Sequence, residues 1–406
     1  MNLKLQQVSA IKSGALQITG SKSETNRLLI LQALYPNIKI ENVSNSDDSV
    51  LMQRALASTD ETVDIHHAGT AMRFLTAYFA LKEGRKTTLT GSKRMQERPI
   101  KILVDALQQL GCDIQYEKEE GYPPINILGT KPEANKVELQ ANVSSQYISA
   151  LMLMASSLPN GLEIALKGKV TSVPYINMTL SLLEDVGIKG AFKDNVITIP
   201  ENKNDIDNTI VVESDWSSAS YFYSIVALSQ NAEITLGSYK KRSYQGDSSL
   251  ATIYKNLGVE TVFGDHTVTL KKNNITNYEA LHGLDLSNSP DIAQTIAVTC
   301  FGLGISCYLT GLHTLKIKET DRLEALKTEI EKLGGEVEIT EDSLRLAASN
   351  RMEKDILIGT YHDHRMAMAF APLALRTSLS IEDADVVSKS YPDFWRDLEK
   401  LGFALG

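Results

Sequence analysis

Cysteine is scarce in this chain of 406 residues, which holds Cys112, Cys300 and Cys307 and no Cys-x-x-Cys pair. An odd number of cysteines without such a pair disfavours a disulfide framework and a zinc ribbon, and is typical of a reducing compartment. Positive charge is in the minority too, because 41 Lys and Arg stand against 50 Asp and Glu, for a net charge of −9. We therefore expect a cytoplasmic location and no nucleic-acid partner.

Long hydrophobic runs are missing where a targeting or membrane segment would need them. The first residues, MNLKLQQVSAIKSG, contain no apolar stretch of signal-peptide length. Residues 292–315 carry no Asp, Glu, Lys or Arg, but Gly302, Gly304 and several polar residues interrupt them. This pattern favours a buried helix that runs into a strand over a membrane span, so we expect no membrane partner.

A repeat runs through the chain. Six segments begin with small polar residues and continue as a long apolar, helix-like run; they start at Lys22, Gly69, Ser144, Asp215, Pro290 and Asp363. After a shorter first spacing, the starts recur every 71 to 75 residues. Amphipathic segments recur with a similar spacing and end in glycine, the usual left-handed stop of a helix, at Gly111, Gly187, Gly258, Gly334 and Gly402. Short strand-like stretches such as TTLTG, AEITLG and CYLTG complete the units.

Six such units divide naturally into three plus three. Each holds two helices and several strands, which is more than a solenoid repeat of about 20–50 residues contains. The sequence therefore predicts an α/β protein with two similar domains of three repeated units each. We place residues 20–213 in the first domain, and residues 1–19 with 214–406 in the second.

Positive charges gather at predicted helix starts, where the helix dipole by itself favours negative ones. Lys22 and Arg27 stand in the first turns of one helix, and Arg365 stands near the start of another. Lys318 and Arg322, four residues apart, are predicted to share one face of a helix that they open. Because free N–H groups at a helix start already bind anions, this arrangement points to small, multiply charged anions such as phosphates and carboxylates.

The sequence does not match the standard nucleotide-binding and metal-binding motifs. The segment GALQITGSKS has five residues between Gly14 and Gly20 and a serine before Lys22, where a P-loop needs four residues and then Gly-Lys. The histidines of His66-His67 and of His362-Asp363-His364 lack further ligands in an HExxH or cysteine motif. We interpret Asp363 as a helix N-cap and expect no metal.

Eight motifs are similar to those of the 5-enolpyruvylshikimate-3-phosphate synthase family: GSKSETNR, AGTAMR, RMQERPI, SSQYISAL, NSPDIAQTIAV, KIKETDR, YHDHRMAM and SKSYPDFW. They span residues 20–395 in family order, nearly the whole chain. The resemblance implies two domains of the inside-out α/β barrel type, with the active site in the cleft between them. It implies that the enolpyruvyl group of phosphoenolpyruvate is transferred to the 5-hydroxyl of shikimate 3-phosphate by addition and elimination, with release of phosphate. This reaction belongs to the shikimate pathway to chorismate and aromatic amino acids, and the family uses no metal or organic cofactor; we further expect a monomer.

The resemblance also implies roles for the residues that match family motifs. Shikimate 3-phosphate would be held by Ser23, Arg27, Ser144, Ser145, Gln146, Ser172, Tyr175, Asp291 and Lys318. Phosphoenolpyruvate would be held by Lys22, Gly69, Arg98, Gln146, Arg322, Arg365 and Lys389. Asp291 would accept the proton of the 5-hydroxyl, and Glu319 with Lys22 would supply the acid for the methylene carbon.

Three positions depart from the commonest family pattern. His67 and Thr314 each stand where Asn is expected, and Phe74 stands where Pro is expected. We expect His67 to affect one phosphoenolpyruvate contact, Thr314 one shikimate 3-phosphate contact, and Phe74 the helix that carries Gly69. None of the three removes a charged catalytic group.

Three other functions stay open from the sequence. A sister enolpyruvyl transferase acting on UDP-N-acetylglucosamine typically presents a reactive cysteine on a mobile loop, whereas Cys112 follows a predicted helix stop and fits a strand. A ligand-binding but catalytically inactive relative is disfavoured by the full set of charged residues. An enzyme acting on nucleic-acid ends is disfavoured by the net charge.

Overall fold

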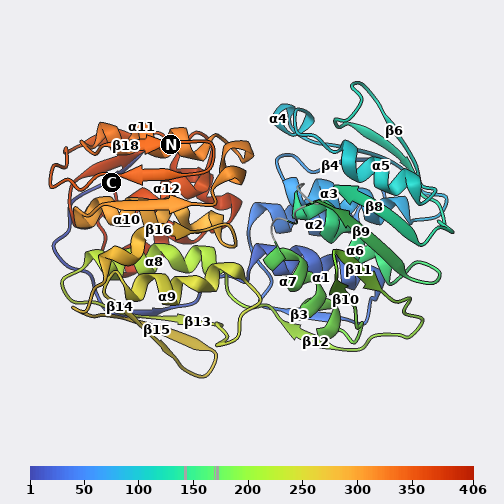
Figure 1. The fold of residues 1–406 in the computed structure, drawn as a ribbon, viewed down its shortest axis with the longest axis horizontal. Helices are drawn as coiled ribbons and strands as arrows, with labels where there is room; N and C mark the ends of the chain where they lie inside the picture. Colours follow the sequence, from blue (N-terminus) through green and yellow to red (C-terminus); the bar gives the residue numbers. More distant parts are fainter. Residues whose placement is uncertain (141–143, 169, 171–172) are drawn as a thin grey trace. The chain divides into compact units, whose positions relative to one another are not determined.

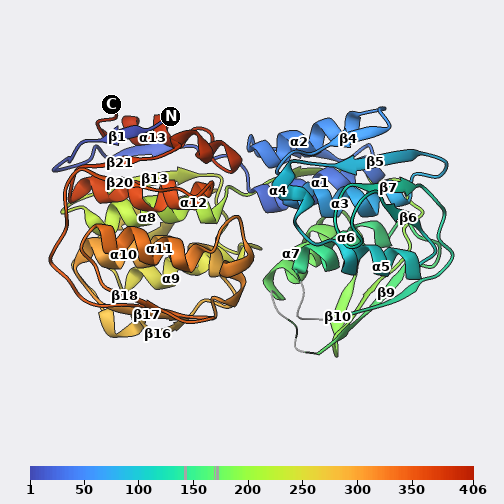
Figure 2. The ribbon, with the colours of Figure 1, turned by 90° about the horizontal axis from the view of Figure 1, so that it is seen from above.

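The computed structural model describes residues 1–140, 144–168, 170 and 173–406. The chain forms two compact units. We call Gly20–Val212 the first unit, and Met1–Thr19 together with Glu213–Gly406 the second unit. Figure 1 shows the fold, and Figure 2 labels the dark-blue strand β1 (Leu3–Leu5) beside the red strand β21 (Leu379–Ile381), with which it pairs in the second unit.

Each unit contains three sheets within the described residues. In the first unit, one sheet has the strand order β4 (Thr62–Asp64), β5 (Lys86–Thr90), β7 (Ile125–Leu128), β6 (Asp113–Tyr116). A second sheet has the order β8 (Lys136–Gln140), β9 (Leu162–Lys167), β11 (Val196–Ile199), β10 (Ala191–Lys193). The third sheet consists of β3 (Lys39–Glu41) and β12 (Thr209–Val211). In the second unit, one sheet has the strand order β2 (Gly14–Leu16), β13 (Glu233–Gly237), β15 (Thr267–Lys272), β14 (Val259–Phe263). A second sheet has the order β16 (His282–Asp285), β17 (Cys307–Thr310), β19 (Leu344–Leu346), β18 (Val337–Ile339). The third sheet has the order β1, β21, β20 (Ile356–Ile358).

The four-stranded sheets share one pairing pattern. In each, the first two strands in the order above are parallel, and the next two pairings are antiparallel. A parallel pair needs a crossover connection, which a helix supplies, whereas an antiparallel pair needs a short turn. The common pattern is the structural form of the sequence repeat.

The six apolar segments are helices, as predicted. They are α1 (Lys22–Leu34), α3 (Gly69–Ala80) and α6 (Ser145–Ala155) in the first unit, and α8 (Trp216–Leu228), α10 (Ala293–Leu303) and α12 (His364–Phe370) in the second. The three helices of each unit pack against one another, and Figure 2 shows those of the second unit between the sheet of β20 and β21 and the sheet of β16 and β17. A helix that is covered on every side has no polar face, which explains why these segments read as apolar runs.

The amphipathic helices lie outside this core. They are α5 (Lys101–Gln109), α7 (Val173–Asp185), α9 (Leu250–Lys255), α11 (Arg322–Lys332) and α13 (Phe394–Lys400). The predicted stop glycines that follow them have φ values of 98°, 89°, 76°, 97° and 95°, so the left-handed stops are confirmed. The sequence did not predict α2 (Asp47–Ala57), which ends at Ser58 without a glycine, or the short α4 (Lys93–Gln96).

The uncharged stretch 292–315 forms α10, a left-handed turn at Gly304 (φ 74°) and strand β17, so the expected helix and strand are confirmed. Across the described ranges, every helix is too short or too polar to cross a membrane.

Candidate functional site

A cluster of charged residues surrounds Asp291 in the second unit. Asp291 lies in the 3₁₀ turn Pro290–Ile292 that leads into α10, and its side chain is 13% exposed. Its Oδ1 lies 2.8 Å from Arg322 Nη1 and 3.4 Å from Lys318 Nζ, and its Oδ2 lies 3.3 Å from Arg365 Nη2. Burial raises the pKa of Asp291, but the three cations outweigh this effect and hold that pKa well below its ordinary value. Asp291 is therefore an ionised carboxylate at neutral pH.

Arg322 is the centre of this cluster. It is the first residue of α11, it is 2% exposed, and each of its three guanidinium nitrogens donates to a different carboxylate. Nε donates to Asp363 Oδ2 at 2.6 Å, Nη1 to Asp291 Oδ1 at 2.8 Å and Nη2 to Glu319 Oε2 at 2.8 Å. Glu319 also lies 3.1 Å from Lys389 Nζ. Charge-assisted bonds of this kind fix the positions of all the groups that they join.

The helix predicted to begin with Lys318 begins later. Asp321 caps α11 by accepting from the backbone N–H groups of Leu323 and Glu324, so Arg322 is the first helical residue and Lys318 lies outside the helix. The prediction that Lys318 and Arg322 share a helical face is therefore wrong. Both still contact Asp291, through ion pairs of 3.4 Å and 2.8 Å.

Asp363 is the predicted N-cap: it caps α12 and accepts from the backbone N–H of Arg365 at 2.9 Å. The Arg365 side chain donates from Nη2 to Ser217 Oγ at 3.3 Å and from Nη1 to the backbone oxygen of Asp291 at 3.2 Å. Ser217 in turn donates to Asp247, a buried carboxylate that the sequence analysis missed. The segment QGDSS around Asp247 matches no recognisable sequence motif. The role of Asp247 depends on its contact with Ser217, which forms when the chain folds.

Burial, followed by the nearby charge of Asp291, raises the pKa of Asp247 to about 6 from an ordinary 3.8. At pH values between 3.8 and about 6, Asp247 is protonated in the folded protein and ionised in the unfolded chain. The free energy of unfolding should therefore fall as pH rises from about 4 to about 7 through this group.

We expect Asp247→Asn to remove that decrease, which amounts to about 1–3 kcal/mol. Urea unfolding of wild type and variant at the two pH values measures it. Asp265→Asn is the matched control, because the Asp265 side chain is fully exposed. If Asp247→Asn left the wild-type difference between the two pH values unchanged, the raised pKa would be contradicted.

A second group of predicted residues lies in the first unit, at the starts of α1 and α3. Lys22 opens α1 after the N-cap Ser21, and its Nζ lies 3.7 Å from Oδ2 of the buried Asp48 on α2. The buried Arg27 donates to Thr179 Oγ1 at 2.8 Å, to Ser149 Oγ at 2.9 Å and, from Nη1, to the backbone oxygen of Ser23 at 2.8 Å. Burial lowers the pKa of Arg27 to about 10, so Arg27 is still a cation at neutral pH.

Gly69, the first residue of α3, lies against Arg98. A Cβ atom at Gly69 would lie 2.4 Å from Arg98 Nη1, so the absence of a side chain lets the guanidinium approach the start of the helix. The buried Arg73 supports this arrangement: it donates to the backbone oxygens of Gly69 at 3.1 Å and Pro99 at 2.9 Å. Arg73 therefore holds the segment that carries Arg98.

The start of α6 contributes the remaining polar residues of this group. Ser144 caps the helix by accepting from the backbone N–H of Gln146, and Ser145 is buried. Gln146 Nε2 donates to Thr70 Oγ1 at 3.2 Å, which joins the starts of α6 and α3. The Tyr175 ring lies beside Arg27, at 5.8 Å from the guanidinium carbon to the ring centroid. Ser172 lies outside the described residues.

The three positions that depart from the family pattern have distinct surroundings. His67 Nε2 lies 3.9 Å from Asp47 Oδ2. Phe74 is buried within an unbroken α3, with the guanidinium carbon of Arg27 5.4 Å from its ring centroid. Thr314 lies in the 3₁₀ turn His313–Ile317, and its Oγ1 has no hydrogen-bond partner among the described residues.

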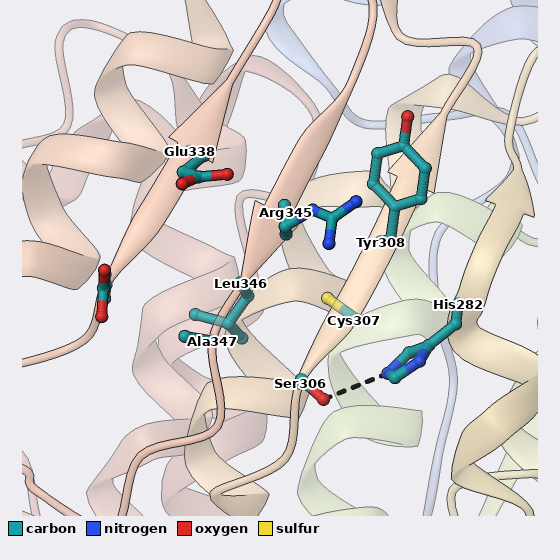
Figure 3. A pocket seen from close by; sticks show the side chains of 9 residues that line it. His282, Ser306, Cys307, Tyr308, Glu338, Arg345, Leu346 and Ala347 are labelled. Atoms are coloured by element: carbon teal, nitrogen blue, oxygen red, sulfur yellow. Dashed lines mark hydrogen bonds between the residues drawn. The ribbon is translucent and has the colours of Figure 1, made fainter.

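A cavity of about 410 Å³ lies elsewhere, on the sheet of β16, β17, β19 and β18. Figure 3 shows Tyr308 and Arg345 on neighbouring strands of this sheet, and His282 Nε2 bonded to Ser306 Oγ at 3.0 Å. None of the cavity's lining residues is a predicted site residue. No group of three or more His, Cys, Asp or Glu side chains in the described parts of the chain could hold a metal ion.

Comparison with known proteins decides the family. Residues 52–398 match the family described as EPSP synthase (3-phosphoshikimate 1-carboxyvinyltransferase). The chain belongs to the EPSP synthase family. A relative named 3-phosphoshikimate 1-carboxyvinyltransferase from Bacteroides fragilis is 46% identical, over 100% of this chain and 99% of the relative. One of the same name from Mannheimia haemolytica is 35% identical, over 98% and 99%.

Solved structures agree on the fold. An EPSP synthase from Acinetobacter baumannii superposes with a TM-score of 0.79 at 18% identity, covering 100% of this chain and 99% of that one. The enolpyruvyl transferase NikO from Streptomyces tendae gives 0.77 at 14% identity, covering 100% and 98%. At such low identity these two show the two-domain α/β fold alone. The family predicted from the eight motifs is confirmed by the sequence relatives.

Proposed function

We propose that this chain transfers the enolpyruvyl group of phosphoenolpyruvate to the 5-hydroxyl of shikimate 3-phosphate and releases phosphate. The observation that carries the proposal is the cluster in which Lys318, Arg322 and Arg365 surround the ionised Asp291. An ionised carboxylate can accept a hydroxyl proton, and the surrounding cations can receive the charge of two polyanionic substrates.

The reaction then proceeds in two steps. In the addition, the 5-hydroxyl oxygen bonds to C2 of phosphoenolpyruvate, its proton passes to Asp291, and the methylene carbon receives a proton from Glu319 or Lys22. In the elimination, the bond between C2 and the phosphate oxygen breaks, the new methyl group returns a proton to Glu319 or Lys22, and phosphate leaves with the proton that Asp291 had accepted. Holding both substrates next to these groups supplies much of the rate enhancement.

Binding divides between the two groups of residues. We assign the phosphoenolpyruvate charges to Arg322, Arg365 and Lys389 in the second unit, together with Lys22, Gly69, Arg98 and Gln146 in the first. We assign shikimate 3-phosphate to Ser23, Arg27, Ser144, Ser145, Gln146, Ser172 and Tyr175, together with Asp291 and Lys318. Arg27 fits this role because each terminal guanidinium nitrogen carries two hydrogens and uses one in its internal bond.

Purified protein is expected to release phosphate from phosphoenolpyruvate when shikimate 3-phosphate is present and not when it is absent. A colourimetric phosphate assay with both substrates, each alone, and UDP-N-acetylglucosamine as the other acceptor tests this. Release with the nucleotide sugar would favour the sister transferase, and no release with either acceptor would favour a binding protein.

We also expect full activity after chelation of divalent metals; activity lost on chelation and restored by a metal would contradict the metal-free reaction. A cytoplasmic location and a monomeric state remain predictions from the sequence.

A further inference from the structure

Helix α11 carries a second buried charge on the same face as Arg322. Glu329 follows Arg322 by seven positions, which places both on one side of the helix two turns apart. Its side chain is 0% exposed. A carboxylate is rarely buried so completely unless it is bonded, and the proposed reaction makes no use of Glu329.

The partners of Glu329 join α11 to the turn that precedes α12. Glu329 Oε1 accepts from the hydroxyl of Tyr361 at 2.6 Å, and Lys332 Nζ lies 2.8 and 2.9 Å from its two oxygens. A Cβ atom at Gly359 would lie 3.1 Å from Glu329 Oε1, so the glycine leaves room for this contact. Burial and the bond to Glu329 raise the pKa of Tyr361 to about 12, so its hydroxyl is a donor at neutral pH.

The turn that Tyr361 belongs to is strained. Tyr361 has a φ of 54° and His362 a φ of 57°, so two consecutive non-glycine residues adopt the left-handed conformation. Such a conformation persists where neighbouring contacts determine it, and it occurs often at functional sites. The next residue is Asp363, which accepts from Arg322 and caps the helix of Arg365.

Two bonds therefore join α11 to this turn from points two helical turns apart: Glu329 to Tyr361, and Arg322 to Asp363. Bonds at two separate points on α11 restrict the orientation of the turn more than either bond alone. We propose that Tyr361 and Glu329 are positioning residues that hold the strained turn against α11, so that Asp363 and Arg365 keep Arg322 and Asp291 in their reactive arrangement. This inference rests on the proposed function and assigns to it two residues outside the substrate-binding set.

Tyr361→Phe removes the hydroxyl and leaves the ring. We expect kcat/KM for phosphoenolpyruvate to fall about tenfold, because Arg322 and Arg365 bind that substrate, while KM for shikimate 3-phosphate changes less than twofold. Glu329→Met removes the acceptor and should have the same effect. Glu329→Gln keeps an oxygen that Tyr361 can reach and should retain near-normal kinetics.

Tyr223→Phe is the control for the loss of a tyrosine hydroxyl away from the turn. The Tyr223 hydroxyl bonds to Thr261 Oγ1 at 2.8 Å in the same unit and is buried, so its loss lowers the melting temperature without altering the kinetics. All variants are assayed well below their measured melting temperatures. Should Glu329→Met fail to fold, Tyr361→Phe and Glu329→Gln still decide the matter.

Wild-type kinetics in Tyr361→Phe, or an equal loss in Glu329→Gln and Glu329→Met, would overturn the inference while the proposed function stands. An equal rise in KM for both substrates would overturn it as well, because it would indicate a general loss of structure. Wild-type protein that releases no phosphate would overturn the proposed function, and the inference with it.

Discussion

Asp291→Asn is expected to lower kcat by about 100-fold or more, with shikimate 3-phosphate still bound, because an amide cannot accept the proton of the 5-hydroxyl. The three cations around Asp291 keep the carboxylate ionised, so it is ready to act as a base at neutral pH. Steady-state phosphate release measures kcat, and titration of intrinsic fluorescence with shikimate 3-phosphate measures binding.

A structural role for Asp291 predicts a different result. A purely structural Asp291 would give a loss of stability in the variant, because the amide no longer neutralises Lys318, Arg322 and Arg365, but nearly normal turnover in the folded protein. Asp285→Asn is the control, because Asp285 is exposed and its carboxylate accepts from the backbone of Ser287 at the end of β16. Near-normal kcat in folded Asp291→Asn protein would refute its assignment as the general base.

Arg322→Met is expected to lower the free energy of unfolding by about 3–5 kcal/mol and to abolish measurable turnover, because it leaves Asp291, Glu319 and Asp363 without their shared cation. Arg322→Lys should recover part of the stability but little activity, since an ammonium group cannot present three nitrogens in a planar fork. Urea unfolding at neutral pH and phosphate release measure the two effects.

The stability defect of Arg322→Met should shrink as pH falls, because Arg322 helps to hold the pKa of Asp291 below its ordinary value, and this stabilisation is lost once Asp291 is protonated. Arg345→Met is the control: Arg345 is exposed on β19 and lies over the Tyr308 ring, with 4.8 Å from the guanidinium carbon to the centroid. Equal losses of stability in the two variants would contradict the central role of Arg322.

The repeat could be found from the sequence because its signals are local. A fully covered helix needs apolar residues on every side, and a left-handed helix stop favours glycine, so both features recur in the letters of each unit. The predicted helices at Lys22 and Gly69 and the stops at Gly187 and Gly334 follow from neighbouring residues alone. The missed α2 has neither signal, since it is amphipathic and ends at Ser58.

Two signals selected the charged residues of the site from the sequence. Cations at helix starts oppose the helix dipole and are therefore unusual, and the same charged residues stand within the family motifs. Their pairing could not be predicted, because it depends on residues far apart in the chain. Asp247 and Ser217 are 30 positions apart, and Glu329 and Tyr361 are 32 apart. The local cap at Asp321 also decided where α11 begins, which moved Lys318 out of the helix.

The sequence by itself determined the α/β repeat, the family and the set of ionisable groups available for catalysis. The tertiary structure alone decided that Arg322 binds three carboxylates, that three cations hold Asp291 ionised and that a strained turn is tied to α11. The physical reason is that periodicity, capping and glycine conformation act between neighbouring residues, whereas charge pairing and pKa depend on distances and burial that exist after the elements have packed.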